Sequence, residues 1–399
     1  MVNIITSFYL NDLCIEHYES GRPEAEIPSS FKEIAKEAFG PISGNAISCL
    51  TVAYTYCILI YGVIRFGDTI SHFVERMHLF DSSAANPILF YFIYAGGLIT
   101  TISKSSNVTL SKLSLVLVLI MFPCFFTLVV PGLQAAQWDT FVEHSGGLFH
   151  GSSSHDIFNS FVTSGPLILL SMEMQKIIPS VTKLCHFDKM LSRTSIVVGG
   201  LIPPLMYSIY VYMSLGNESY CVKEQLPEIF FIFQMATLMG AATAAGMSVS
   251  GEFESLLSNI SFQKVFPILS HDTKNEETMD IMTIPEKENH EILYEQRYSV
   301  PAVLCAILPP LLLGLIIISS SGGDERVVIR ALDFAGGYIV PAFIWIFPAL
   351  LAWNGVLKKE SETDTIFSFW RDKITILWVI FASVGMTCLE LVHDFGGLY

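Results

Sequence analysis

Long apolar runs are the feature that most constrains this chain. Each holds about 20 residues, the length of helix needed to cross a hydrocarbon core about 30 Å thick. Strands are excluded from such runs, because an open sheet leaves backbone groups unpaired in lipid. We therefore expect an all-α, polytopic membrane protein. The expected spans are roughly 44–66, 86–104, 112–136, 157–180, 193–216, 226–250, 297–320, 330–354 and 373–393.

Composition supports this class and excludes others. The chain is 52% hydrophobic and 15% charged, whereas about 25% is usual for soluble domains. A net charge of −15 argues against the basic patches on which nucleic-acid binding depends. The sequence has no phosphate-binding loop, dinucleotide fingerprint, nucleophile elbow or metal-binding His pair. We therefore expect neither an enzyme nor a cofactor or metal site.

The spans divide the chain into four parts. Residues 1–15 form a partial transmembrane helix, 16–250 a membrane bundle of about six helices, 251–296 an acidic cytoplasmic loop and 297–399 a bundle of three helices. Positive residues favour the cytoplasmic side. With 16–43 placed there, all but five of the 22 Lys and Arg residues fall in cytoplasmic loops. The exceptions are Arg65, Arg76, Lys223, Arg326 and Arg330.

The span 157–180 is the main candidate for a binding site. Pro166 lacks an amide proton and follows Gly165, so the helix is expected to break inside the membrane. Broken helices in transporters offer backbone groups to a substrate; the alternative is a simple proline kink. Glu173 either carries a proton or pairs with Lys176. The predicted substrate-binding residues are Thr163, Ser164, Gly165, Ser171 and Glu173.

Hydroxyl groups in the span 226–250 suggest an ion site. Thr243 and Ser248 lie among small residues that allow close helix packing. The alternative is that each hydroxyl bonds to a preceding carbonyl of its own helix. We predict that Thr243 and Ser248 bind a coupling ion, H⁺ or Na⁺.

Several stretches resemble the hydroxy/aromatic amino acid permease family, which includes the tyrosine- and tryptophan-specific permeases. The likeness covers roughly residues 30–395, including Phe31–Val63 and Thr243–Ser248. One family pattern is carried by Pro166, Ser171, Pro179, Ser180, Gly200, Ile202, Pro203 and Tyr207. A second is carried by Ala335, Gly336, Gly337, Pro348, Ala349, Leu350, Ala352 and Trp353.

The resemblance implies an inverted-repeat, LeuT-like bundle of the amino acid–polyamine–organocation superfamily. Substrate would sit at the midplane. The chain departs from the family in two places. Against the family pattern it is N-terminally truncated, with about nine full helices plus a partial one and no first, broken helix. The family's Phe-Gly-aromatic centre reads Met172, Glu173 and Met174 here.

We therefore expect a secondary active transporter that imports an amino acid, with the aromatic tyrosine or tryptophan as the first choice. It would work by alternating access, coupled to protons, in the lipid bilayer of a plasma membrane or a plastid-type organelle. The alternative is a non-transporting remnant or a regulatory or binding paralogue, which the missing first helix favours. A channel is disfavoured, because no repeated pore loop occurs.

Overall fold

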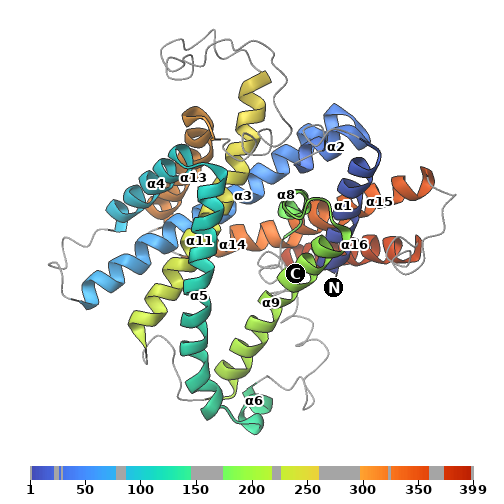
Figure 1. Cartoon of the computed structure of the whole chain (residues 1–399). Coiled ribbons are helices and arrows are strands. Elements are labelled where there is room, and N and C mark those ends of the chain that lie inside the picture. Colours follow the sequence, from blue (N-terminus) through green and yellow to red (C-terminus); the bar gives the residue numbers. More distant parts are fainter. Residues whose placement is uncertain are drawn as a thin grey trace. The chain divides into compact units, whose positions relative to one another are not determined.

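The computed structural model describes residues 2–21, 27, 30–77, 87–144, 174–217, 226–259, 297–321, 325–358 and 373–396. Within these ranges every regular element is a helix (Figure 1). Among these described residues, eight helices are long and apolar enough to cross a membrane. The predicted class, an all-α polytopic membrane protein, is thereby confirmed.

Seven of the eight candidate spans are single helices. They are α3 (Pro41–Arg76), α4 (Pro87–Lys104), α5 (Asn107–Ala135), α9 (Lys189–Leu215), α11 (Pro227–Asn259), α13 (Val300–Ser321) and α16 (Lys373–Gly396). The eighth begins at the end of α14 (Glu325–Phe334). It continues through two π-helical segments, η4 (Ala335–Ile339) and η5 (Pro341–Ile346), into α15 (Phe347–Lys358).

The shorter helices are α1 (Val2–Glu19), α2 (Phe31–Phe39), α6 (Trp138–His144), η2 (Gln175–Ile177) and α8 (Ile178–Leu184). Local chemistry explains several ends. Ser30 accepts a hydrogen bond from the amide of Glu33 and so caps α2. Gly40, at φ +91°, ends α2 in a conformation that suits glycine. Asp188 caps α9 by accepting from the amide of Leu191 at 2.7 Å.

Some boundaries differ from the predicted ones. The partial helix 1–15 continues to Glu19, and α11 continues to Asn259, into the predicted loop 251–296. Of the ninth predicted span, 157–180, residues 157–173 lie outside the described residues. Its described end is not one rod, because Met174 is non-helical and is followed by the one-turn η2 and then α8.

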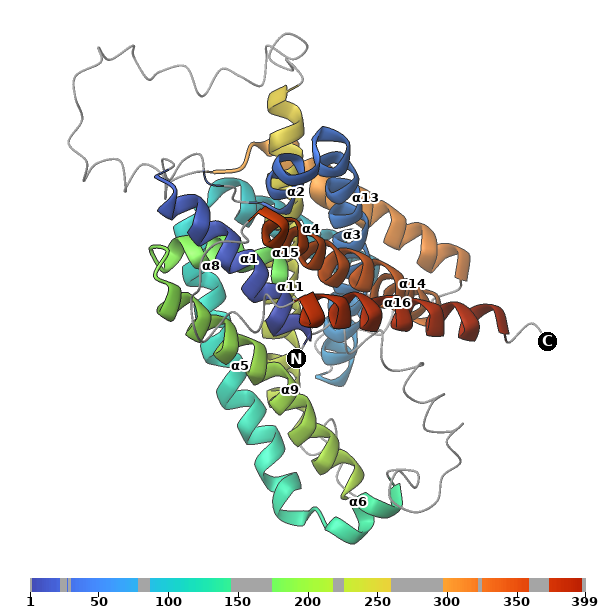
Figure 2. The same cartoon turned by 90° about the vertical axis from the view of Figure 1, so that its right-hand side faces the viewer.

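The helices form two compact units. Unit 1 holds Met1–Tyr54, Val129–Cys221 and Ile329–Tyr399, and unit 2 holds Thr55–Leu128 and Val222–Val328. In unit 1, α1 packs against α8, α9, η5 and α15, and Figure 2 shows α1 running beside α8 and α9. The apolar face of α2 also packs in this unit. The ring centroid of Phe31 lies 4.9 Å from that of Phe343 and 5.7 Å from that of Phe347.

In unit 2, α4, α11 and α13 pack closely through small residues. A Cβ added at Gly246 would lie 2.5 Å from Cδ1 of Ile102 and 3.2 Å from Cδ1 of Ile307, so Gly246 permits this approach. The backbone amide and hydroxyl of Ser299 both donate to the carboxylate of Glu254 just before α13 begins. Burial, and then the charge of Glu254, raises the pKa of the nearby Tyr298 phenol.

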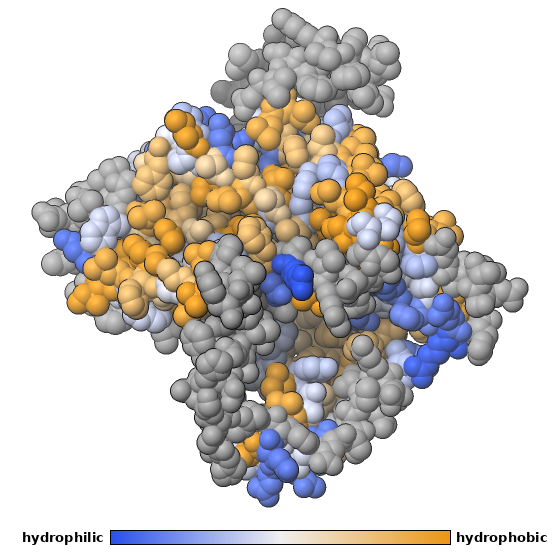
Figure 3. Space-filling view, turned by 180° about the vertical axis from the view of Figure 1, so that it is seen from behind, coloured by the Kyte–Doolittle hydropathy of each residue, from blue (hydrophilic) through white to orange (hydrophobic). Residues whose placement is uncertain are grey.

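Apolar side chains also cover much of the surface. On the face shown in Figure 3, hydrophobic residues occupy most of the area contributed by described residues. Large exposed side chains include Leu119 at 62%, Leu205 at 60% and Phe381 at 79%. Such a surface is stable in lipid and not in water.

Candidate functional site

A stripe of polar side chains runs along the buried side of α1. Asn3, Thr6, Ser7 and Asn11 recur at three- and four-residue spacing, which places them on one face of a helix. Thr6, Ser7 and Asn11 are fully buried. Buried polar groups are costly unless they find hydrogen-bond partners. The hydroxyls of Thr6 and Ser7 donate to the carbonyl of Asn3 in the same helix, whereas Asn3 and Asn11 accept from side chains outside α1. We call these four residues the α1 polar stripe.

Gln175 joins the polar stripe to the end of the predicted span 157–180. Its Nε2 group lies 3.1 Å from both the backbone and side-chain oxygens of Asn3, and 2.9 Å from Oγ1 of Thr6. Its Oε1 accepts from the backbone amide of Met174 at 3.0 Å. Gln175 is fully buried, and it therefore fixes the non-helical residue Met174 against α1.

Trp345 reaches the same place from η5. Its indole Nε1 donates to Oδ1 of Asn3, so one amide oxygen accepts from both Gln175 and Trp345. Three segments far apart in sequence, α1, η2 and η5, thus converge on Asn3. Because a π-helical segment inside an α-helix often marks a functional site, the position of Trp345 on η5 adds weight to this junction.

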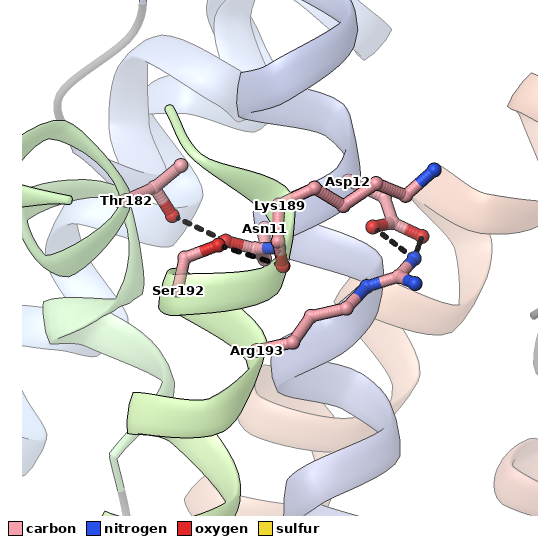
Figure 4. Close-up of polar contacts among 6 residues, drawn as sticks. All are labelled: Asn11, Asp12, Thr182, Lys189, Ser192 and Arg193. Carbon is pink, nitrogen blue, oxygen red and sulfur yellow. Dashed lines mark hydrogen bonds and ion pairs between the residues drawn. The ribbon is translucent and has the colours of Figure 1, made fainter. Parts of the chain in front are cut away.

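The other end of the stripe carries a buried ion pair (Figure 4). Arg193 of α9 donates to both carboxylate oxygens of Asp12, at 2.6 and 2.8 Å, and both residues are 7% exposed. One residue away, Thr182 of α8 donates to Oδ1 of Asn11 at 2.7 Å. These contacts fasten α1 to α8 and α9. Breaking such a buried pair is strongly destabilising.

Asn11 retains one unused donor. Its Nδ2 is buried and has no hydrogen-bond partner among the residues that the structure describes. A buried donor of this kind is commonly satisfied by an ordered water. This end of the stripe therefore has a hydrogen-bond donor that the described side chains do not satisfy.

The junction is built from neutral hydrogen-bonding groups. Asn3, Thr6, Gln175 and Trp345 offer amide, hydroxyl and indole groups, which hydrogen-bond without changing their protonation state. Among the described residues, no group of three or more His, Cys, Asp or Glu side chains could hold a metal ion. These groups bond to one another and hold η2 and η5 against α1.

The predicted substrate-binding residues are not part of the described structure. Thr163, Ser164, Gly165, Ser171 and Glu173 all lie outside the described residues. The structure does describe the residue that follows them, Met174, and it places that residue at the polar stripe.

The two predicted ion-binding residues lie on α11 in unit 2. Thr243 is buried at 2% exposure and Ser248 is half-buried. Their five-residue spacing puts them about 140° apart around the helix axis. They therefore do not share one face of α11, and an ion held by both would need a distorted helix.

The sequence carries a signal for the α1 polar stripe, although none of its residues is among the predicted site residues. Asn3, Thr6, Ser7 and Asn11 repeat with the period of a helix face between apolar residues. Their partners Gln175 and Trp345 lie 172 and 342 positions from Asn3, so pairing required the fold. Arg193, which the charge pattern assigns to a cytoplasmic loop, is instead buried near the start of α9.

Comparison with known proteins identifies the family. The profile of the tryptophan/tyrosine permease family matches residues 2–263, about two-thirds of the chain. No curated protein matches the sequence. The matched region contains the α1 polar stripe, Gln175 and the ion pair of Asp12 with Arg193. The chain, an integral multi-pass membrane protein, belongs to the tryptophan/tyrosine permease family.

Proposed function

We propose that this protein is a secondary active transporter that imports an aromatic amino acid, tyrosine or tryptophan, by alternating access. The observation that carries the proposal is the junction of Gln175 with Asn3 and Thr6. Asn3, Thr6 and Asn11 of α1 hydrogen-bond to neighbouring segments, and membership of a family of amino acid permeases supplies a reason for this polar contact.

The chemistry of the junction supports the proposed substrate class. A zwitterion carries one ammonium and one carboxylate group, and neutral amide, hydroxyl and backbone groups bind both. Trp345 of η5, at 5% exposure, donates to Asn3 and so brings an indole ring to the junction. Stacked or edge-on aromatic contacts favour an indole or phenol ring by about 0.5–1.5 kcal/mol.

The segment that ends at Met174 would form the other wall of the site. Thr163, Ser164 and Gly165 would offer hydroxyl and backbone groups, and Ser171 and Glu173 further polar contacts. Gln175 holds the end of this segment against α1. A transporter can then alternate by moving α1 relative to this wall, without covalent chemistry.

Coupling to protons is the second part of the proposal. Glu390 of α16 is a carboxylate at 5% exposure inside a candidate span. It lies against Gly337 of η4, where an added Cβ would be 2.7 Å from its Cγ. Carboxylates buried in membrane helices commonly take up and release protons during transport. Glu173 is the second candidate, and Thr243 and Ser248 remain the candidates for a Na⁺-coupled cycle.

Uptake by the purified protein in liposomes tests both parts. We expect saturable uptake of radiolabelled tryptophan or tyrosine that accelerates when the outside is made acidic. Glu390→Gln should abolish the acceleration, whereas Glu143→Gln, on the short helix α6, should not. Uptake no faster than in empty liposomes would contradict transport, and binding without uptake would support the non-transporting alternative.

A further inference from the structure

Helix α9 contains two consecutive prolines inside a candidate span, Pro203 and Pro204. In an α-helix the carbonyl of residue i accepts from the amide of residue i+4. Proline has no amide proton, so the carbonyls of Gly199 and Gly200 lose their regular donors. Within lipid, each such oxygen requires another partner, because an unsatisfied backbone group costs several kcal/mol.

Helix α13 has the same motif, and there one of the two freed carbonyls, that of Cys305, has a side-chain partner among the described residues. Pro309 and Pro310 lie inside α13, and Pro309 removes the regular donor of the carbonyl of Cys305. The hydroxyl of Tyr56 donates to this carbonyl at 2.6 Å. A neighbouring helix thus supplies a permanent partner for the carbonyl in unit 2.

No such partner is supplied in α9 by the described residues. No described side chain donates to the carbonyl of Gly199 or Gly200. Both positions are glycine, so no side chain covers these oxygens from their own residues. Gly199 is exposed and Gly200 is half-buried. The carbonyls are therefore open to a ligand.

Gly200 lies beside the start of α1, whereas a Cβ added at Gly199 would meet nothing within 4 Å. A Cβ added at Gly200 would be 3.0 Å from Cγ1 of Ile4 and 2.9 Å from Cε of Met174. Ile4 follows Asn3, and Met174 precedes Gln175 and shares a hydrogen bond with it. Carbonyls of a helix point toward its C-terminal end, so those of Gly199 and Gly200 point away from the Asp12–Arg193 pair.

We propose that the carbonyl oxygens of Gly199 and Gly200 bind the ammonium group of the amino acid substrate. The inference rests on the proposed function and names a site that it did not include. An ammonium group has only donors, and carbonyl oxygens are only acceptors, so the two match without a buried countercharge. The double proline keeps both oxygens unoccupied until substrate arrives.

Replacing the prolines tests this directly. Pro203→Ala with Pro204→Ala provides amides that bond to the carbonyls of Gly199 and Gly200. We expect the affinity of the purified full chain for tryptophan to fall tenfold or more. Affinity for indole-3-propionate, which lacks the ammonium group, should change less than twofold. The matched control, Pro309→Ala with Pro310→Ala, should leave both affinities unchanged, and both variants should melt at or above the wild-type temperature.

The outcomes separate the inference from the proposed function. If the wild-type chain binds tryptophan and the α9 variant binds it equally well, the inference is overturned alone. Equal loss for tryptophan and indole-3-propionate overturns it too, because general packing would then explain the effect. If the α9 variant changes only the Na⁺ dependence of tryptophan binding, the carbonyls bind a metal cation instead of an ammonium group. That result also overturns the inference. A wild-type chain that binds no aromatic amino acid overturns both proposals together.

Discussion

The polar contacts of α1 in unit 1 differ in kind from the apolar contact of α4, α11 and α13 in unit 2. In unit 1, α1 meets its neighbours through hydrogen bonds and the ion pair of Asp12 with Arg193. In unit 2, α4, α11 and α13 meet through apolar side chains that fit around glycine, as Ile102 and Ile307 do at Gly246.

The difference indicates which unit is adapted for binding. In lipid, burying an apolar side chain between helices stabilises the contact little, because lipid tails are equally apolar. Small residues stabilise it by letting the helices pack closely. Buried hydrogen bonds hold one geometry well but can exchange partners with a ligand or water. This contrast supports the proposal that unit 1 recognises the substrate.

The largest effect is expected from Asp12→Ala. This change removes the carboxylate that faces the buried guanidinium of Arg193, and breaking a buried pair in this way costs about 3–5 kcal/mol. Thermal unfolding in detergent measures the loss. Asp139→Ala, at an exposed position of α6, is the control and should change stability by less than about 0.5 kcal/mol.

A double change sharpens this prediction. Adding Arg193→Met to Asp12→Ala replaces both charges, so most of the lost stability should return. If the double variant is as unstable as Asp12→Ala alone, the ion pair is not what holds α1 to α9.

Gly246→Leu probes the apolar packing of unit 2. Even a Cβ at this position lies 2.5 Å from Ile102, so a leucine should cost up to about 3 kcal/mol through overpacking. Gly97→Leu on α4 is the control, because an added Cβ there meets nothing within 4 Å. Equal melting temperatures for the two variants would show that the packing at Gly246 is loose.

Tyr56→Phe should have the smallest effect. It removes the hydroxyl that donates to the carbonyl of Cys305 at 2.6 Å, and the net loss for one hydrogen bond is about 1 kcal/mol. Combining it with Pro309→Ala should restore the stability, since the new amide satisfies the same oxygen. No recovery in the double variant would argue against the account of the two double-proline helices.

Hydropathy is sufficient to predict most of the membrane helices. Eight of the nine predicted spans correspond to candidate spans of the structure, because a run of about 20 apolar residues has few alternatives in lipid. Boundaries are less accurate: α3 runs from Pro41 to Arg76, well beyond the predicted 44–66. Helices can continue past the hydrocarbon core, and hydropathy alone does not show where they end.

The polar junction is not predicted from the sequence, for a physical reason. The free-energy cost of placing a polar residue in a membrane span marks Glu173 and Thr243 as unusual. Which polar residues act together, however, is decided by contacts between distant segments. Gln175 makes the contacts to Asn3 and Thr6, and no local pattern distinguishes it from other polar residues. The π-helical form of η4 and η5 is not predicted either, since it depends on neighbours such as Ser383, which donates to the carbonyl of Pro341.

The affinity of Gln175→Ala for tryptophan tests the central claim most directly. Equilibrium binding would be measured on folded protein, with Gln134→Ala on the exposed side of α5 as the matched control. If the junction of α1 with Gln175 forms part of the substrate site, the Gln175 variant should bind at least tenfold more weakly, about 1.4 kcal/mol, and the control should bind as the wild type does. Wild-type affinity in both variants would contradict the account.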